Sequence, residues 1–231
     1  MKKATAGDPR AAAGGKTQGR ILDTTLALFN EKGPDRVTTA EIARAVGINE
    51  GNLYYHFKTK EALLQALFKK LEDDATAFMV DAGSNTETDR GVFLGFMQRW
   101  FSIVWHHRYI FRDLPGIIAI APSLREPTRA LSSGMRIVIE ETLRQMRGAQ
   151  LIDVPDEDAP QLLANVWIVS TYWAVYLSLQ EGIEELVEEH RDWGLNQVAS
   201  LFRPYLSDEA KQELNIRMGR PTVQKSTSTS E

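Results

Sequence analysis

Residues 38–57 read TTAEIARAVGINEGNLYYHF and contain two short helical segments that meet at a glycine. Thr38 and Glu41 have the spacing of a capping box, in which the hydroxyl and the carboxylate each satisfy a free backbone amide. Gly47 can adopt the left-handed conformation that ends a helix and turns the chain sharply. Asn49 is placed to cap the second segment. This layout is typical of a helix-turn-helix, whose second helix enters the DNA major groove.

The second segment has two different faces. At about 100° per residue, Leu53 and Phe57 lie on one side and anchor the segment to its domain, with His56 near them. Gly51 would keep the helix thin near the groove, and Asn52 can make a bidentate contact to an adenine edge. Tyrosines offer hydroxyls to phosphates and rings to thymine methyls. The residues free to face a partner are Gly51, Asn52, Tyr54 and Tyr55.

A structural helical hairpin with a solvated aromatic face is the alternative, because helix-turn-helix geometry also occurs without DNA. The distribution of charge favours DNA binding. Residues 1–70 hold 12 Lys and Arg against 7 Asp and Glu, whereas the remainder holds 15 against 24. Lys58 and Lys60 directly follow the second segment, where they would neutralise phosphates. A basic head on an acidic body indicates that the head meets an anion.

The run from Arg20 to Leu64 resembles the N-terminal domain of the TetR/AcrR family of bacterial transcriptional regulators. The matching runs are RILDTTLALFNEKG and VTTAEIARAVGINEGNLYYHFKTKEALL. The resemblance implies a homodimer that reads a near-palindromic double-stranded DNA operator. It also implies a larger C-terminal domain that binds a small-molecule effector, with repression as the default mode of regulation.

The resemblance assigns roles to single residues. Thr38 and Thr39 would hold a phosphate at the N-terminus of the first segment, where the helix dipole assists. The aromatic residues of the second segment and Lys60 would grip the DNA backbone. Glu50 departs from the pattern, since many relatives carry lysine there; its carboxylate either accepts from a cytosine amino group or points away, and we favour the second interpretation. The predicted DNA-binding residues are Thr38, Thr39, Asn49, Gly51, Asn52, Tyr54, Tyr55, His56, Lys58 and Lys60.

Nearly every periodic segment has helical spacing, so the sequence predicts an all-α fold. An N-terminal three-helix helix-turn-helix domain precedes a larger helical ligand-binding and dimerisation domain. The predicted divisions are a disordered tail at 1–17, the DNA-binding domain at 18–64, a connecting helix at 65–80, the body at 81–215 and a disordered tail at 216–231. Besides the short helix capped by Asn49, helices are predicted over 18–32, 39–46, 59–80, 89–107, 110–120, 128–147, 158–181, 184–206 and 208–218.

Aromatic residues gather in the body. One interpretation is a ligand cavity for an effector that is largely apolar or planar, and the alternative is that these side chains only form core. Arg108 or Arg112 could pair with an anionic group on such an effector. The candidate pocket residues are Trp100, Phe101, Trp105, Tyr109, Trp167 and Trp173.

The segment from Leu162 to Leu179 is the longest apolar stretch and approaches the length of a bilayer span. Its polar residues and acidic C-terminal flank favour a helix buried on nearly all sides of a soluble assembly, so no membrane contact is expected. The helices at 158–181 and 184–206 are the predicted dimer interface. Each would pack against the same two helices of a symmetry-related copy.

Several classes of site and function are disfavoured. The chain has no cysteine, which excludes disulfides and thiolate metal sites and fits a cytoplasmic protein. His106 and His107 have no carboxylate at helical spacing after them, so no metal site is predicted, and no cofactor is expected. Hydrolase, metalloprotease and phosphate-loop motifs are absent, so an enzyme is the least favoured class. A helical interaction or ligand-binding module without DNA binding is the main alternative.

Overall fold

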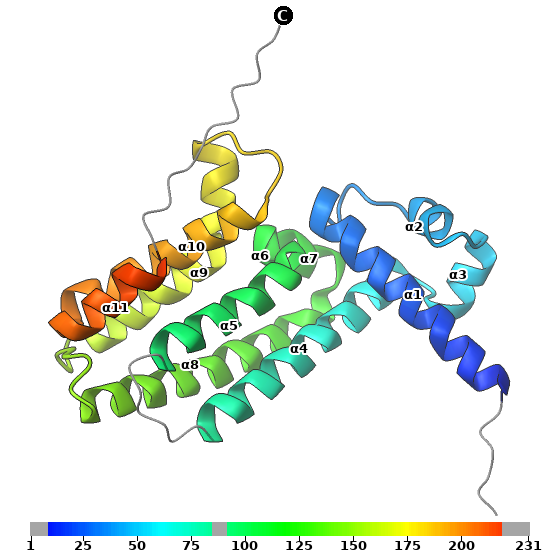
Figure 1. Cartoon of the computed structure of the whole chain (residues 1–231). Coiled ribbons are helices and arrows are strands. Elements are labelled where there is room, and N and C mark those ends of the chain that lie inside the picture. The colour runs from blue at the N-terminus through cyan, green and yellow to red at the C-terminus, as the bar shows by residue number, and fades with distance from the viewer. Residues whose placement is uncertain (1–8, 85–91, 219–231) are drawn as a thin grey trace, which may run out of the picture.

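The computed structural model describes residues 9–84 and 92–218, where helices are joined by turns and loops and one isolated bridge pairs Ile152 with Leu206. At one end lies a small head made of α1 (Pro9–Lys32), α2 (Thr39–Val46) and α3 (Glu50–His56), and α4 (Lys60–Ser84) runs from this head along the body (Figure 1). The predicted all-α fold with an N-terminal helix-turn-helix is confirmed.

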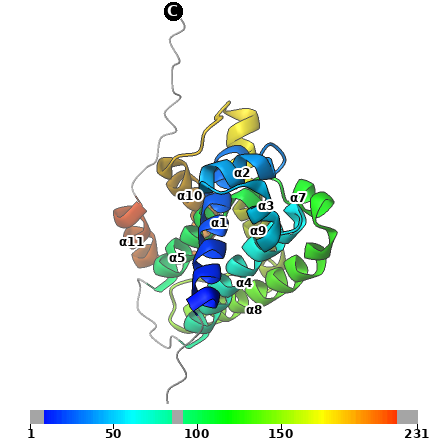
Figure 2. The same cartoon turned by 90° about the vertical axis from the view of Figure 1, so that its right-hand side faces the viewer.

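The body consists of layered helices. The helices α4, α5 and α8 lie along one another, and α9 packs against α10 (Figures 1 and 2). A 3₁₀ turn, η1, precedes α8, and a second, η2, follows α10. The bounds of the body elements are α5 Val92–His106, α6 Arg108–Arg112, α7 Leu114–Ile120, η1 Pro122–Leu124, α8 Arg125–Gly148, α9 Ala159–Gln180, α10 Glu188–Phe202, η2 Arg203–Tyr205 and α11 Asp208–Met218.

Two hydrophobic cores divide the molecule differently from the predicted division at residue 81. The head core contains α1 to α4 and also buries residues of α6, α7 and η1, among them Tyr109, Ile117 and Leu124. The second core joins α5, α8, α9, α10 and α11. A segment that follows α5 in the sequence therefore completes the core of the DNA-binding head, and it connects head and body by direct packing.

Several predicted boundaries are corrected. The helix α1 begins at Pro9, so residues 9–17 are helical and not part of a disordered tail; alanine, which occurs three times in this run, has the highest helix propensity. The predicted helix over 110–120 is interrupted at Asp113, whose carboxylate accepts from the Gly116 amide at 3.0 Å and starts α7. The remaining tail residues and 85–91 lie outside the described residues.

The connecting and C-terminal elements also differ from prediction. The helix α4 extends to Ser84, beyond the predicted end at residue 80, and α10 begins at Glu188, after the predicted start at 184. Residues 216–218 belong to α11. By length and composition α9 could cross a membrane, with 39% of the apolar window buried inside the molecule. Its buried side packs against α10.

Candidate nucleic-acid interface

The start of α2 is capped and tied to α1. Thr38 Oγ1 accepts from the Glu41 amide at 3.2 Å, as predicted. The Glu41 carboxylate lies 2.6 Å from Lys32 Nζ, and this hydrogen bond is the main reason that the pKa of Glu41 is lowered, with the Thr38 amide contributing less. The Glu41 side chain therefore joins α2 to α1, which extends the predicted capping role.

The turn between α2 and α3 is built from two residues with special roles. Gly47 has φ +76°, in the left-handed region that favours glycine, and it ends α2. Asn49 Oδ1 accepts from the Asn52 amide at 2.8 Å and caps α3. Because this oxygen accepts a hydrogen bond inside the protein, Asn49 fixes the start of the recognition helix, and its amide nitrogen is the donor it can offer to DNA.

The two faces of α3 are separated as predicted. Leu53 is 0% exposed and Phe57 5% exposed, and both lie in the head core. On the opposite side Tyr55 is 82% exposed and Tyr54 43% exposed, while Gly51 and Asn52 are also exposed. Two adjacent tyrosines exposed on the face opposite the buried Leu53 and Phe57 form an aromatic patch of the kind found at binding surfaces.

Contacts among the side chains give this surface a defined shape. Tyr54 Oη lies 2.9 Å from Thr39 Oγ1, so the recognition helix is joined to the N-terminus of α2. The half-buried His56 ring packs edge-on against Tyr55, with ring centroids 5.2 Å apart. These contacts bring the predicted phosphate-binding threonine and the predicted aromatic contacts into one continuous face.

The basic residues that follow α3 differ in their surroundings. Lys58 is exposed, whereas Lys60, at the start of α4, is partly buried. Burial is the main cause of a lowered pKa for Lys60, and nearby Asp35 opposes it. Glu50 is exposed at the first turn of α3. All ten predicted DNA-binding residues therefore lie in the α2–α3–α4 corner of the head.

Arg112 and Asn30 connect this head to the body. Asn30 is 7% exposed; its Nδ2 donates to the His106 carbonyl at 2.8 Å, and its Oδ1 accepts from the Tyr109 amide at 2.9 Å. Arg112 Nη1 donates to the Asn30 carbonyl at 3.0 Å. The end of α1 is thus held by the corner between α5 and α6. Sequence reasoning missed this link because its partners are about eighty positions apart.

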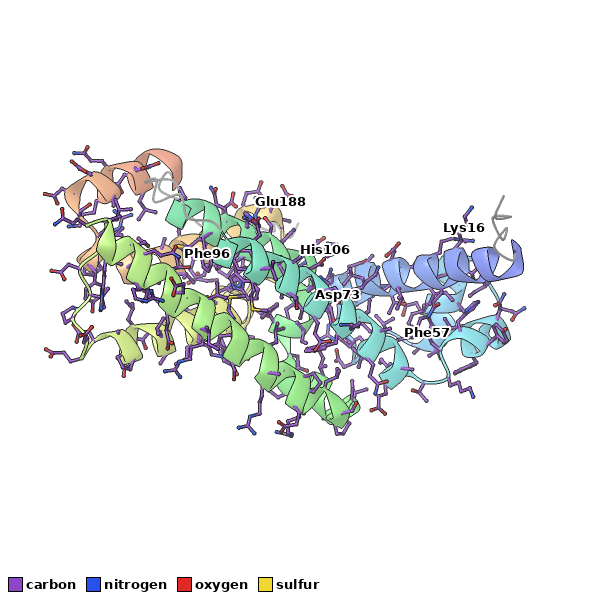
Figure 3. The ribbon with its side chains drawn as sticks, turned by 90° about the horizontal axis from the view of Figure 1, so that it is seen from below. Lys16, Phe57, Asp73, Phe96, His106 and Glu188 are labelled. Atoms are coloured by element: carbon purple, nitrogen blue, oxygen red, sulfur yellow. The ribbon has the colours of Figure 1, made fainter. Side chains whose placement is uncertain are left out.

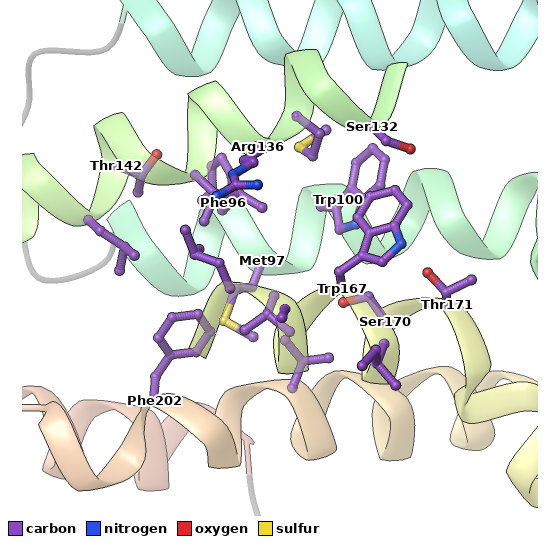
Figure 4. A pocket seen from close by; sticks show the side chains of 18 of the residues that line it. Phe96, Met97, Trp100, Ser132, Arg136, Thr142, Trp167, Ser170, Thr171 and Phe202 are labelled. Atoms are coloured by element: carbon purple, nitrogen blue, oxygen red, sulfur yellow. The ribbon is translucent and has the colours of Figure 1, made fainter. Parts of the chain in front are cut away.

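A second candidate site lies in the body, in a cavity of about 420 Å³ between α5, α8, α9 and α10 (Figure 4). Three of the six predicted pocket residues line it: Trp100, Phe101 and Trp167. Arg136 of α8 is a charged residue of the lining, and its Nε donates to Glu140 at 2.9 Å. Nothing in the spacing of α8 indicated that Arg136 would face a cavity.

The other three predicted pocket residues lie elsewhere, and the prediction is corrected for them. Tyr109 is 1% exposed in the head core, 6.2 Å from Phe29 between ring centroids. The Trp105 ring is covered by the Arg108 guanidinium at 4.3 Å. Trp173 packs against Gly194 of α10. Arg108 and Arg112 are likewise outside the cavity lining, because both donate to backbone carbonyls near the head.

An exposed second helix, pinned by Leu53 and capped by Asn49, places the chain among helix-turn-helix DNA-binding proteins. Residues 61–214 match the model of the TetR bacterial transcriptional repressors, and residues 21–67 match that of the bacterial regulatory proteins of the tetR family. The chain therefore belongs to the TetR family of bacterial transcriptional regulators. The family and the fold are those of regulators and not of enzymes.

Individual relatives are similar to different extents. The nucleoid occlusion factor SlmA of Haemophilus ducreyi is 38% identical over 63 residues, which is 27% of this chain and 31% of that protein. The chain thus spans about a third of the length of this curated relative. The biofilm operon negative regulator IcaR of Staphylococcus epidermidis is 24% identical over 194 residues, 81% of this chain and 97% of that protein. The crystal structure of a TetR-family regulator from Marinobacter aquaeolei VT8 has a TM-score of 0.76 and 27% identity, and the match covers 87% of this chain and 97% of that one.

Proposed function

We propose that this protein is a cytoplasmic repressor that binds a near-palindromic operator and is released from it by a small-molecule effector. The observation that carries the proposal is the separation of faces on α3, where fully buried Leu53 lies opposite Tyr55, which is 82% exposed. A helix fixed so firmly on one side can present the other side to a groove with little loss of conformational entropy.

In this proposal, some residues of the α2–α3–α4 corner contact DNA phosphates and others contact base edges. Thr39, Tyr54 and Lys60 contact phosphates and set the register, since phosphate contacts position a protein on DNA and carry no sequence information. Asn52 reads a base edge from the middle of α3. Glu50 stands at the first turn, where a carboxylate beside phosphates costs affinity unless it points away from them or accepts from a cytosine.

Two variants test this assignment of phosphate contacts and base contacts. With the DNA upstream of its own gene as probe, Lys60→Ala should weaken binding for every sequence and reduce the slope of log affinity against log salt by about one. Asn52→Ala should instead change the preferred base at one position of each half-site, at a cost of about 1–3 kcal/mol for the original base. Fluorescence anisotropy at several salt concentrations measures both. Wild-type affinity in both variants would exclude this groove assignment.

The cavity supports an effector that is mainly apolar and carries one acidic group. Its volume of about 420 Å³ is within the usual range for small-molecule sites, and its walls are mostly aromatic and aliphatic. Arg136 is the side chain placed to pair with an acid, although Glu140 already neutralises part of its charge. Binding of apolar carboxylic acids, and loss of that binding in Arg136→Met, would support this chemistry; equal binding of neutral analogues would contradict it.

Release would pass through the contacts between body and head. An effector between α5, α8 and α9 lies against the helices on which α4 packs, and the α5–α6 corner holds Asn30 of α1. Displacement of α4 changes the separation of the two recognition helices in a dimer, so that they no longer match successive major grooves. A coupling free energy of about 1–3 kcal/mol changes operator affinity roughly 5- to 150-fold.

The dimer is proposed to form through α9 and α10. Four exposed apolar residues of α9 recur at helical spacing and form one stripe, and Tyr176 in this stripe stacks on Trp193 of α10 with ring centroids 5.7 Å apart. Light scattering at micromolar concentration should give twice the mass of the chain. Tyr172→Glu in the centre of the stripe should shift the mass toward that of one chain, and an unchanged dimer would place the interface elsewhere. The stripe comprises Ile168, Tyr172, Tyr176 and Leu179.

A further inference from the structure

A group of three potential metal ligands lies between the head and the body. Asp74 of α4, His106 at the end of α5 and His107 after it each offer one donor atom, and these atoms all lie within 4.8 Å of one another. Figure 3 shows His106 in the middle of the molecule, between Phe96 of the body and Phe57 of the head. The carboxylate comes from a different helix, which is why spacing after the two histidines gave no sign of it.

The His107 ring presents one of its two nitrogens to Asp74. Its side chain is 0% exposed, and its Nε2 lies 2.7 Å from Asp74 Oδ2. The other ring nitrogen, Nδ1, is buried and points away from Asp74, so an ion shared with Asp74 binds His107 through Nε2.

We propose that Asp74, His106 and His107 bind a divalent first-row transition-metal ion, for which Zn²⁺ is the appropriate probe. Two imidazole nitrogens and one carboxylate oxygen form a donor set that Zn²⁺ accepts, with water in the fourth position. Bond lengths of about 2.0–2.2 Å in a tetrahedron require ligand atoms about 3.4 Å apart. Asp74 must therefore move slightly away from His107, and it can do so because its side chain is 51% exposed. His106 is exposed as well.

One neighbouring charge sets a limit on the affinity. Lys70 lies one turn before Asp74 on α4, and its positive charge acts on His107. Lys70 is itself paired with Asp23 of α1 at 2.6 Å, which reduces its repulsion of a cation. A site with three protein ligands, an exposed side and a nearby ammonium group binds an ion reversibly, unlike a structural zinc site with four ligands.

An ion bound at this location would link two parts of the structure. Asp74 belongs to α4, whereas the carbonyl of His106 is held by Asn30 of α1. An ion bound here joins α4 directly to the α5–α6 corner, next to the contacts that hold the head on the body. Because the three donor atoms already lie close together, metal binding stabilises this arrangement of helices.

The test is a titration of the purified full-length protein with Zn²⁺ in competition with a chromogenic chelator. The wild type should bind one ion per chain with a dissociation constant on the order of micromolar. His106→Gln and Asp74→Asn should each weaken binding at least about tenfold. His190→Gln is the matched control, because it makes the same chemical change at a histidine whose Nδ1 accepts from the Val187 amide in another part of the body. Its affinity for zinc should equal that of the wild type.

Thermal unfolding supplies an independent readout. At a free Zn²⁺ concentration about a hundredfold above the dissociation constant, Tm should rise by roughly 5 °C in the wild type and in His190→Gln, and not in His106→Gln. His106→Gln is suited to this comparison because the His106 side chain is exposed and only its backbone carbonyl contacts Asn30. The proposal is overturned if zinc binds more weakly than about 100 µM, or if His106→Gln binds it as tightly as the wild type.

Discussion

The head and the body of this protein are both helical, but the side chains of the head are packed more closely than those of the body. In the head core, eight hydrophobic side chains have no exposed surface at all, and all but Ala121 belong to α1, α2, α3 or α4: Ile21, Phe29, Ile42, Leu53, Leu63, Leu64, Leu67 and Ala121. The body encloses a cavity of about 420 Å³ and leaves an apolar stripe on α9 uncovered. Close packing gives the head one rigid shape for DNA, and incomplete packing leaves the body able to respond to a ligand.

Replacing one leucine by alanine in the head and one in the body should give the largest difference in stability between the two regions. Leu53→Ala removes a fully buried side chain from α3, and we expect it to cost about 3–4 kcal/mol of the free energy of unfolding and to abolish operator binding. Leu163→Ala, at the half-buried wall of the cavity, should cost about 1 kcal/mol and leave operator binding intact. Urea denaturation measures both. Equal costs would show that the cavity wall is as tightly packed as the head.

A pair of glycine substitutions tests whether the body has any region packed as closely as the head. A Cβ added at Gly194 would lie 2.7 Å from the Trp173 ring, so Gly194→Ala should destabilise the body by about 1–3 kcal/mol. Gly95→Ala in α5 meets no atom within 4 Å and should stabilise the protein by up to about 1 kcal/mol. Differential scanning calorimetry should therefore show a lower Tm for Gly194→Ala and a higher Tm for Gly95→Ala. A lower Tm for both would mean that α5 also needs glycine for close packing.

The same contrast explains which features could be predicted from sequence. The caps at Thr38 and Asn49, the turn at Gly47 and the buried face at Leu53 obey rules that act over three or four residues. Each of these local rules predicts one conformation for its residues, so the helix-turn-helix could be predicted almost residue by residue.

The body could be predicted only in outline, because periodicity tells which face of a helix is apolar and not which helix covers it. Tyr109 was expected in a ligand pocket and lies in the head core. Arg136 enters the cavity from α8, a helix that the aromatic pattern did not include. Asp74 joins two histidines from thirty positions away. These contacts depend on how helices dock, and no local rule specifies that docking.

Arg112→Met should weaken the connection between the two regions with a smaller effect on stability. The substitution removes two hydrogen bonds, to the carbonyls of Asn30 and Glu31, and should cost about 1–2 kcal/mol. Operator affinity should change little, whereas the fold-decrease in affinity produced by an effector should become smaller. Arg129→Met, at an exposed arginine paired with Glu126 on the same helix, is the matched control and should alter neither property. An unchanged effector response in Arg112→Met would exclude this route of coupling.

Asn49→Ala is expected to have a small effect on stability and a larger one on DNA binding. The loss of the 2.8 Å hydrogen bond to the Asn52 amide should cost about 1 kcal/mol, because the first turn of α3 keeps its backbone bonds. That turn carries both Glu50 and Asn52, so its fraying moves a base-reading side chain without unfolding the head. Asn49→Ser restores a cap and should recover most of the stability and of the operator affinity. If Asn49→Ser recovers stability but not operator affinity, the Asn49 amide nitrogen itself contacts DNA.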